Sequence, residues 1–173
     1  MKVINLFAGP GAGKSTTRAL LFGHLKMLGF NCEEVTEYAK DLFWERHNSL
    51  LTDQLMILAN QNRRLERLKG KVDLVITDSP LLLSLHYKTL NYLPNTFQSL
   101  LFELWHTYHN VNFFINRNKP YSVIGRMQTE EEAKKIDIEI KQLLSNNNID
   151  FIPVEADEKI IINITDHLIK NKH

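Results

Sequence analysis

The amino-acid sequence predicts an α/β fold, a three-layer sandwich in which a parallel sheet of five strands lies between two layers of helices. Short apolar segments, typical of strands buried on both faces, alternate with longer segments whose apolar residues recur every three or four positions. A repeated order of strand, crossover helix and strand makes the strands parallel and places helices on both faces. Because the 173 residues contain no internal repeat, low-complexity tract or long linker, we expect residues 1–173 to form a single domain.

The predicted strands and helices follow one another from the first residues to the last. We expect strands at residues 3–7, 31–35, 72–77, 111–115 and 151–154, and helices at residues 15–28, 38–47, 52–69, 130–145 and 158–170, with two more helices within 81–108. The first helix carries Ala19, Leu20, Leu25 and Leu28 and is followed by Gly29, a residue type that commonly ends helices. The helix at 52–69 is expected to turn Leu51, Leu55, Leu58, Leu65 and Leu68 largely toward the core.

Charge and composition exclude several classes of protein. With 21 Lys and Arg against 20 Asp and Glu, no global field holds the chain on nucleic acid or on an anionic membrane, so a nucleic-acid role needs a local basic patch. The apolar runs are short and no cationic, apolar leader opens the sequence, so we expect a cytoplasmic protein without a membrane partner. The single cysteine, Cys32, excludes an internal disulfide and a cysteine-based metal site.

The segment between the first strand and the first helix is rich in glycine and ends in Lys14-Ser15. Such a loop points successive backbone N–H groups inward at a phosphate, and the helix that follows adds the positive end of its dipole. Lys14 is expected to reach the β- and γ-phosphates of a nucleotide, and the Ser15 hydroxyl to bind Mg²⁺. The predicted phosphate-binding residues are Gly9, Pro10, Gly11, Ala12, Gly13, Lys14, Ser15 and Thr16.

The loop departs from the usual P-loop pattern at one position. That pattern has a glycine five residues before Gly13, and this sequence has Ala8 there, with Gly9 and Gly11 inside the loop. The alternative is a plain glycine turn followed by Lys and Ser by chance. The apolar strand before the loop and the helix after it favour the P-loop, so the predicted fold class is that of the P-loop NTPases.

Carboxylates follow the second and third predicted strands, at the sheet edge where ligands bind in such folds. Asp78, after the apolar run 74–77, is expected to act on Mg²⁺ directly or through a water, although an N-cap for a helix opening near Pro80 is an alternative. Glu37 is the candidate general base for an acceptor hydroxyl. The alternative for Glu37 is a solvated glutamate at a helix start.

A polar segment at about 117–129, after the fourth strand, is predicted to be a lid. Arg117 and Arg126 are the candidates for stabilising a transferring phosphoryl group, with Lys119 weaker because an ammonium lacks the bidentate fork. A solvated basic loop is the alternative. Thr129 and Glu132 form a Thr-x-x-Glu capping box, and the helix behind them carries an apolar stripe made of Ala133, Ile136, Ile140, Leu143 and Leu144.

The helix at 52–69 also carries amides and guanidinium groups. Gln61, Arg63 and Arg64 are candidates for reading a base or holding an acceptor phosphate, and Tyr38 before this helix is a candidate for stacking on a base. A plain solvated helix face is the alternative for the charged residues.

Four segments taken together carry a family resemblance. AGPGAGKST, VTEYAKDL, VITDSPLL and RNKPYSVIGRMQTEEEAKKID, spread over about residues 2–140, resemble a family of small P-loop proteins common in bacteriophages and often labelled only as ATP-binding. The Glu-Tyr-Ala-Lys element and the Gly-Arg of the lid also resemble, more distantly, the ribosylnicotinamide kinase domain of the bifunctional NAD-biosynthesis regulator. The broader pattern is similar to thymidylate and deoxynucleoside kinases, including phage enzymes that phosphorylate 5-hydroxymethyluracil in DNA.

The resemblance implies ATP and Mg²⁺ as cofactors and a kinase activity, with Glu37 and Asp78 on the acceptor side and Arg117 and Arg126 in the lid. The implied acceptor is a nucleoside, a nucleotide or a hydroxymethylated base in DNA, the last of which needs base extrusion and a local basic surface. If the chain is phage-encoded, the implied location is the host cytoplasm, and the oligomeric state stays open, a homodimer included. The alternative is a regulatory NTPase or nucleotide switch that hydrolyses ATP without a small acceptor.

Overall fold

A single parallel sheet organises the chain. The computed structural model describes residues 1–87, 95–118 and 129–171. Its strands are β1 (Lys2–Phe7), β2 (Cys32–Val35), β3 (Leu74–Thr77), β4 (His109–Asn116) and β5 (Ile152–Glu155). Each predicted strand is present, with bounds that agree within two residues. The strands pair in the order β2-β3-β1-β4-β5 and every pair is parallel, so the predicted five-stranded parallel sheet is confirmed.

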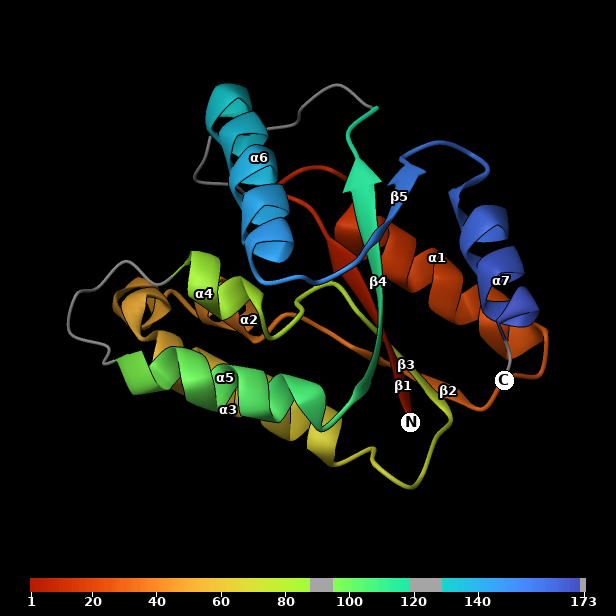
Figure 1. Cartoon of the computed structure of the whole chain (residues 1–173), viewed down its shortest axis with the longest axis horizontal. Coiled ribbons are helices and arrows are strands. Elements are labelled where there is room, and N and C mark those ends of the chain that lie inside the picture. Colours follow the sequence, from red (N-terminus) through yellow and green to blue (C-terminus); the bar gives the residue numbers. More distant parts are fainter. Residues whose placement is uncertain (88–94, 119–128, 172–173) are drawn as a thin grey trace.

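Helices cover both faces of this sheet (Figure 1). They are α1 (Lys14–Met27), α2 (Tyr38–Trp44), α3 (Gln54–Glu66), α4 (Leu83–His86), α5 (Asn95–His106), α6 (Glu130–Asn146) and α7 (Ile160–Lys170), with a 3-10 helix η1 (Asn48–Thr52) before α3. On one face, Leu21 of α1 and Ile164 of α7 pack on Ile4 and Ile76 of the strands. On the other face, residues of α3, α4, α5 and α6 pack on Val3, Phe7, Val75 and Phe114. Alternate strand residues thus feed two separate core layers.

Two helices bury a different face from the one their leucines suggest. In α1, Leu20 is 56% exposed and Leu28, just past its end, is 51% exposed, while Thr17, Leu21 and Leu25 are buried. In α3, Leu55 is 48% exposed although we expected it to face the core. Polar residues near the site take buried positions, such as Thr17 in α1 and Gln61 in α3. The apolar stripe of α6 is as predicted, with Ala133, Ile140 and Leu144 fully buried.

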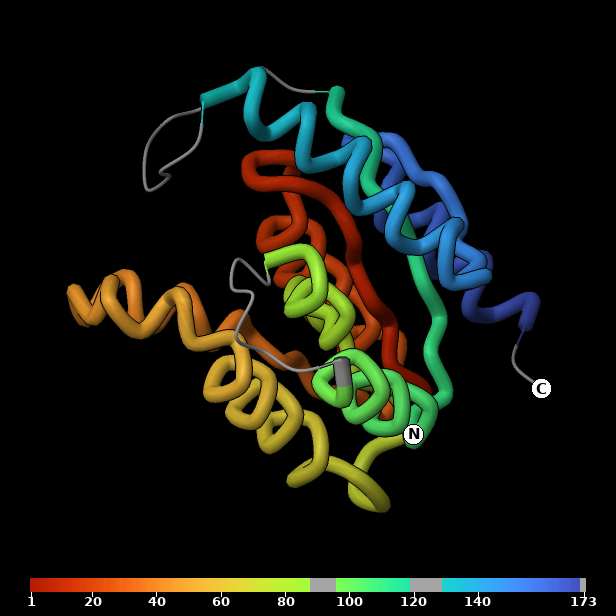
Figure 2. The backbone as a smooth tube through the Cα atoms, turned by 60° about the vertical axis from the view of Figure 1, so that its left-hand side comes forward, coloured from red at the N-terminus to blue at the C-terminus, as the bar shows by residue number. Residues whose placement is uncertain are grey.

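The strand order brings four chain segments together at one edge of the sheet. The register pairs Thr77 of β3 with Asn5 of β1 on one side and with Val35 of β2 on the other. On the far side of β1, Phe114 of β4 lies opposite Phe7. The residues that directly follow β1, β2, β3 and β4 therefore meet at the carboxyl edge, where Figure 2 shows the loop after β1 beside α6. No helix in the part of the chain that the structure describes has the length and apolar character needed to cross a membrane.

Candidate active site

The loop between β1 and α1 has the backbone shape of an anion cradle. Gly11 and Gly13 adopt φ values of 77° and 100°, a region that side chains disfavour. Gly13 is the N-cap of α1, so no side chain caps the first turn of this helix, and that turn contains no acidic residue. The N–H groups at the start of α1 and its positive dipole end are thus left for a bound anion.

At the start of the loop, the position that requires a glycine is Gly9 and not Ala8. Neither has positive φ, so the first position of the loop needs no glycine for its backbone conformation. Ala8 is buried in the apolar layer beneath the loop. Gly9 is required for space instead, because a Cβ there would lie 2.6 Å from the Ala133 carbonyl oxygen and 2.9 Å from Oδ1 of Asp137. The glycine at position 9 thus reflects close packing of the loop on α6.

Lys14 extends over the loop that precedes it. Its Nζ donates hydrogen bonds to the carbonyl oxygens of Ala8, at 2.7 Å, and Gly9, at 3.0 Å. Burial lowers the pKa of the Lys14 ammonium, while the negative charges of Glu37, Asp78 and Asp137 act in the opposite direction. The electrostatic coupling places Lys14 in one cluster with three carboxylates from three different elements.

Glu37 is the second residue after β2, at the N-cap position of α2, but its side chain does not cap that helix. Burial raises the pKa of the Glu37 carboxyl, and the positive charge of Lys14 opposes this effect. The pKa of the Tyr87 hydroxyl, at the end of α4, is raised chiefly by burial and further by Glu37 and Asp137. Glu37 is half-buried, and its carboxyl interacts electrostatically with Lys14, Asp78 and Tyr87.

Helix α3 fixes the backbone on both sides of Glu37. Gln61 is buried, its Oε1 accepts a hydrogen bond from the Tyr38 N–H at 3.0 Å, and its Nε2 donates to the Thr36 carbonyl at 3.2 Å. Arg64 donates to the Thr36 carbonyl and hydroxyl, at 3.1 and 2.9 Å, and forms an ion pair with Asp41. These contacts give Gln61 and Arg64 a supporting position beside Glu37, and their contact with an acceptor stays a prediction.

Two other predicted acceptor residues differ in their surroundings. The ring of Tyr38 lies beneath the Arg64 guanidinium, 5.2 Å from ring centroid to Cζ, so one face of the ring is covered. Arg63 is exposed.

Asp78 follows β3 and is almost completely buried, at 3% exposure. Its Oδ1 lies 3.3 Å from Nε of Arg18, but neither atom has a well-aligned hydrogen bond. Arg18 also pairs with Glu34 on β2. Asp78 does not cap a helix near Pro80, because α4 begins at Leu83 with Leu82 as its N-cap. A buried carboxylate oxygen without an aligned donor is suited to a cation or a cation-bound water.

Arg117 is held on the outer side of the phosphate loop. Its Nη1 donates to the Pro10 carbonyl at 2.8 Å, and its Nε and Nη2 both donate to Oδ2 of Asp137, at 3.0 and 2.8 Å. The two side chains are only 9% and 15% exposed. In this arrangement the guanidinium holds the loop, and a role of Arg117 in stabilising a transferring phosphoryl group stays a prediction. Arg126 and Lys119, and the rest of the predicted lid between 118 and 129, lie outside the described residues.

The capping box predicted at the start of α6 is present. The Thr129 side chain accepts from the Glu132 N–H at 3.2 Å, and the Glu132 carboxylate accepts from the Thr129 N–H at 2.7 Å.

Three residues of this cluster were not predicted from the sequence: Arg18, Asp137 and Tyr87. Arg18 lies four positions after Lys14, on the same face of α1, and this spacing could have identified it. Asp137 is a carboxylate inside the apolar stripe of α6, four positions after Ala133, which is itself a sign of a paired charge. Nothing in the local pattern distinguishes Tyr87.

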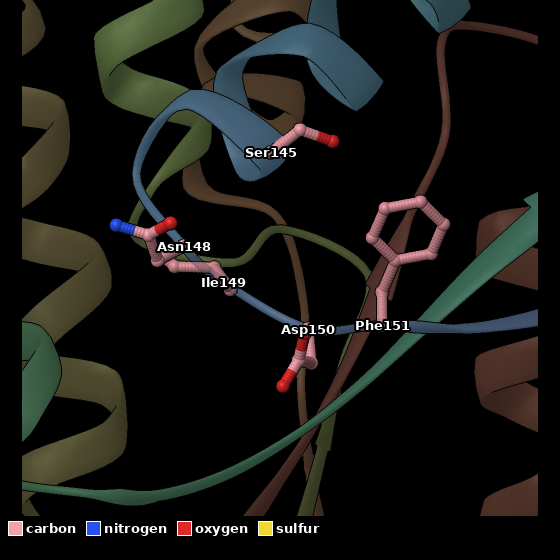
Figure 3. A pocket seen from close by; sticks show the side chains of 5 residues that line it. All are labelled: Ser145, Asn148, Ile149, Asp150 and Phe151. Atoms are coloured by element: carbon pink, nitrogen blue, oxygen red, sulfur yellow. The ribbon is translucent and has the colours of Figure 1, made fainter.

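A surface hollow elsewhere in the molecule lacks comparable chemistry. Figure 3 shows the hollow between the end of α6 and the start of β5, lined by Ser145, Asn148, Ile149, Asp150 and Phe151. It lies at the amino end of β5, so the sheet separates it from the phosphate loop at the carboxyl edge.

The fold and the loop together define the class of this protein as a P-loop NTPase. A family model described as an AAA domain matches residues 3–159. The chain therefore belongs to this AAA domain family. No curated protein matches the chain.

Two solved structures share the fold over nearly the whole chain. A thymidylate kinase from Ehrlichia chaffeensis superposes with a TM-score of 0.61 at 14% identity, covering 96% of this chain and 97% of the other. A deoxyadenosine kinase from M. mycoides, solved with bound dATP, superposes with a TM-score of 0.57 at 18% identity, covering 96% and 98%. At these identities the similarity establishes the fold.

Proposed function

We propose that this protein is an ATP- and Mg²⁺-dependent phosphotransferase that moves the γ-phosphoryl group to a hydroxyl of a nucleoside-type acceptor. The observation that carries the proposal is Glu37, a carboxyl with a raised pKa held in the same charge cluster as Lys14. The same carboxyl could orient an attacking water, so phosphate transfer to an acceptor is the property that separates a kinase from a hydrolysing NTPase. The two kinases that share the fold are named for a nucleotide acceptor, thymidylate, and for a nucleoside acceptor, deoxyadenosine. Their names support phosphoryl transfer to an acceptor of this kind.

The residues of the loop form the donor half of this proposed site. The N–H groups of residues 11–16, in the loop and at the start of α1, bind the phosphates, and Lys14 exchanges its two bonds to loop carbonyls for phosphate oxygens. Ser15 and Asp78 suit Mg²⁺, since both offer oxygen ligands and one oxygen of Asp78 is buried without an aligned donor. Mg²⁺ would supply neutralisation of the charge that develops on the phosphates.

Glu37 belongs to the acceptor half. Its carboxylate accepts the proton of the attacking hydroxyl, or orients that hydroxyl toward the γ-phosphorus. The raised pKa of Glu37 moves it toward the operating pH, which makes it a better base than an ordinary glutamate.

The ion pairs of Arg18 and Arg64 favour an acceptor whose reacting group is a neutral hydroxyl and not a phosphate. Arg18 is paired with Glu34 and Asp78, and Arg64 with Asp41. Neither guanidinium is thus available to an acceptor phosphate without breaking an ion pair. A free nucleoside or the hydroxymethyl group of 5-hydroxymethyluracil in DNA meets this condition, and a nucleoside monophosphate does so less well.

The test is transfer of labelled phosphate from γ-labelled ATP with Mg²⁺ to a panel of nucleosides, nucleoside monophosphates and hydroxymethyluracil-containing DNA. We expect one hydroxyl acceptor to gain label, Lys14→Ala to abolish transfer, and Glu37→Gln to lower kcat by about 10²- to 10⁴-fold. Phosphate release that is independent of every acceptor would overturn the proposal and favour the nucleotide switch. Turnover of Glu37→Gln within a few-fold of the unmodified protein would overturn the role of Glu37.

A further inference from the structure

Two chain segments converge on the carboxylate of Asp137 in α6. Oδ1 accepts a hydrogen bond from the Gly9 N–H, the first amide of the phosphate loop. Oδ2 accepts from Nε and Nη2 of Arg117, the residue that follows β4. Because Arg117 also binds the Pro10 carbonyl, the loop is attached to Asp137 twice, once directly and once through the guanidinium.

Two features distinguish this attachment from a surface ion pair: the burial of both side chains and the close packing of the loop on α6. Both side chains are largely buried, so breaking the pair leaves an uncompensated charge in the protein. Gly9 approaches α6 so closely that a Cβ would clash with the Ala133 backbone. The contact fixes Gly9 and Pro10, the two residues that lead the chain into the turn, while the anion-binding amides lie further along.

We propose that Asp137 is a positioning residue for nucleotide binding, which holds the phosphate loop in its binding shape through Gly9 and, by way of Arg117, through Pro10. This inference rests on the proposed nucleotide site. It assigns Asp137 no contact with the nucleotide and no part in the transfer step. A loop held in advance in this shape loses less conformational entropy on binding, so the expected effect is on nucleotide affinity.

The experiment measures the dissociation constant of a fluorescent ATP analogue with Mg²⁺ and without any acceptor, for proteins shown by circular dichroism to be folded. Asp137→Asn keeps an oxygen for the Gly9 N–H but removes the charge that pairs with Arg117, and Asp137→Ala removes both contacts. We expect the dissociation constant to rise about tenfold for Asp137→Asn and further for Asp137→Ala, as when groups that support binding residues are lost. Glu139→Gln is the matched control, since Glu139 lies on the same helix and its two ion pairs are both long, at 3.7 Å.

A double variant separates positioning from general stability. In Arg117→Met/Asp137→Leu, no buried charge is left unpaired, so we expect the free energy of unfolding to recover relative to Asp137→Ala. Nucleotide affinity should remain weak, because Gly9 and Pro10 have still lost their partners. Hydrogen exchange of the loop amides should be faster in both Asp137→Ala and the double variant than in the control.

Two results would overturn the inference: an affinity within twofold of the unmodified protein for Asp137→Ala, or an affinity in the double variant that recovers together with stability. Failure of the proposed function has a different signature. In that case no acceptor gains phosphate, whatever the nucleotide affinity of the Asp137 variants.

Discussion

At the scale of single residues, the candidate site is marked by charged groups that are buried at some cost. Burial raises the pKa of Glu37 and lowers the pKa of Lys14, so it favours the neutral form of each group. In each case the opposite charge of the other group counteracts the shift. Groups shifted in this way are common where a protein does chemistry, since a surface carboxylate or ammonium would be solvated and ordinary. The pKa directions lead to two predictions about Glu37.

The first prediction concerns the pH dependence of phosphoryl transfer. If the carboxylate form of Glu37 is the active form, kcat/KM should fall on the acid side with a midpoint above the ordinary glutamate value of 4.5, because burial raises the pKa of this group. Glu37→Gln should lose this acid limb along with most of its activity. A limb that persists unchanged in the residual activity of Glu37→Gln would assign it to another group. Initial rates over a pH series at constant ionic strength provide the measurement.

The second prediction concerns stability. The pKa of Glu37 is raised on folding, so Glu37 binds its proton more tightly in the folded chain than in the unfolded one. Its contribution to the free energy of unfolding is therefore complete below about pH 4.5, the ordinary glutamate value. The contribution falls as the pH rises through the folded-state pKa of Glu37. Glu37→Gln cannot titrate and should escape this fall. We expect this variant to be more stable than the unmodified protein at pH 7, with the difference smaller at pH 4. Urea unfolding at the two pH values measures it, and a variant less stable at pH 7 would contradict the assigned direction.

At the scale of elements, α3 acts as a support for the turn between β2 and α2. The buried amide of Gln61 bonds the backbone on both sides of Glu37, and Arg64 bonds Thr36 from one turn further along the helix. The helix thus determines where the carboxyl of Glu37 lies without contacting it.

A third prediction tests this support. Gln61→Leu leaves the Tyr38 N–H and the Thr36 carbonyl without their side-chain partner, so we expect a loss of about 1–3 kcal/mol in the free energy of unfolding. A drop in kcat with little change in KM for ATP should accompany it, because the base moves while the phosphate loop does not. The control is Leu55→Gln on the same helix, half exposed and expected to change stability by less than about 0.5 kcal/mol. Equal losses in the two variants would contradict the role of Gln61.

Sequence patterns predicted the elements better than the partners of their side chains. Each strand and helix has a local signal, such as the apolar run before Asp78 or the Thr129–Glu132 capping box, and these are confirmed. The partner of Arg117 is 20 residues away on another element, and the partners of Gln61 lie 23 and 25 residues before it. Such pairings depend on how helices pack on the sheet, which local periodicity does not encode. The same limit explains why Leu55, which is half exposed, was expected to face the core.

At the scale of the whole molecule, the strand order divides the site between two sides of β1. The segments after β2 and β3 bring Glu37 and Asp78 from one side, and the segment after β4 brings Arg117 from the other. The phosphate loop emerges from the central strand between them. All five strands are parallel, so the sequence predicted that their carboxyl ends share an edge but not which strands are neighbours.

The fourth prediction follows from this arrangement, because a nucleotide bound at the centre of the sheet edge stabilises the whole fold. At a free ATP concentration 100 times the dissociation constant, with Mg²⁺, the stabilisation is about 2.7 kcal/mol. For a chain of this size that corresponds to a rise in melting temperature of about 5–10 °C. Lys14→Ala should lose most of the rise, since Lys14 is the side chain expected on the phosphates, whereas Glu37→Gln should keep it, since Glu37 belongs to the acceptor half. Thermal unfolding with and without Mg-ATP distinguishes these outcomes. An equal rise in Lys14→Ala would place nucleotide binding elsewhere than at this loop.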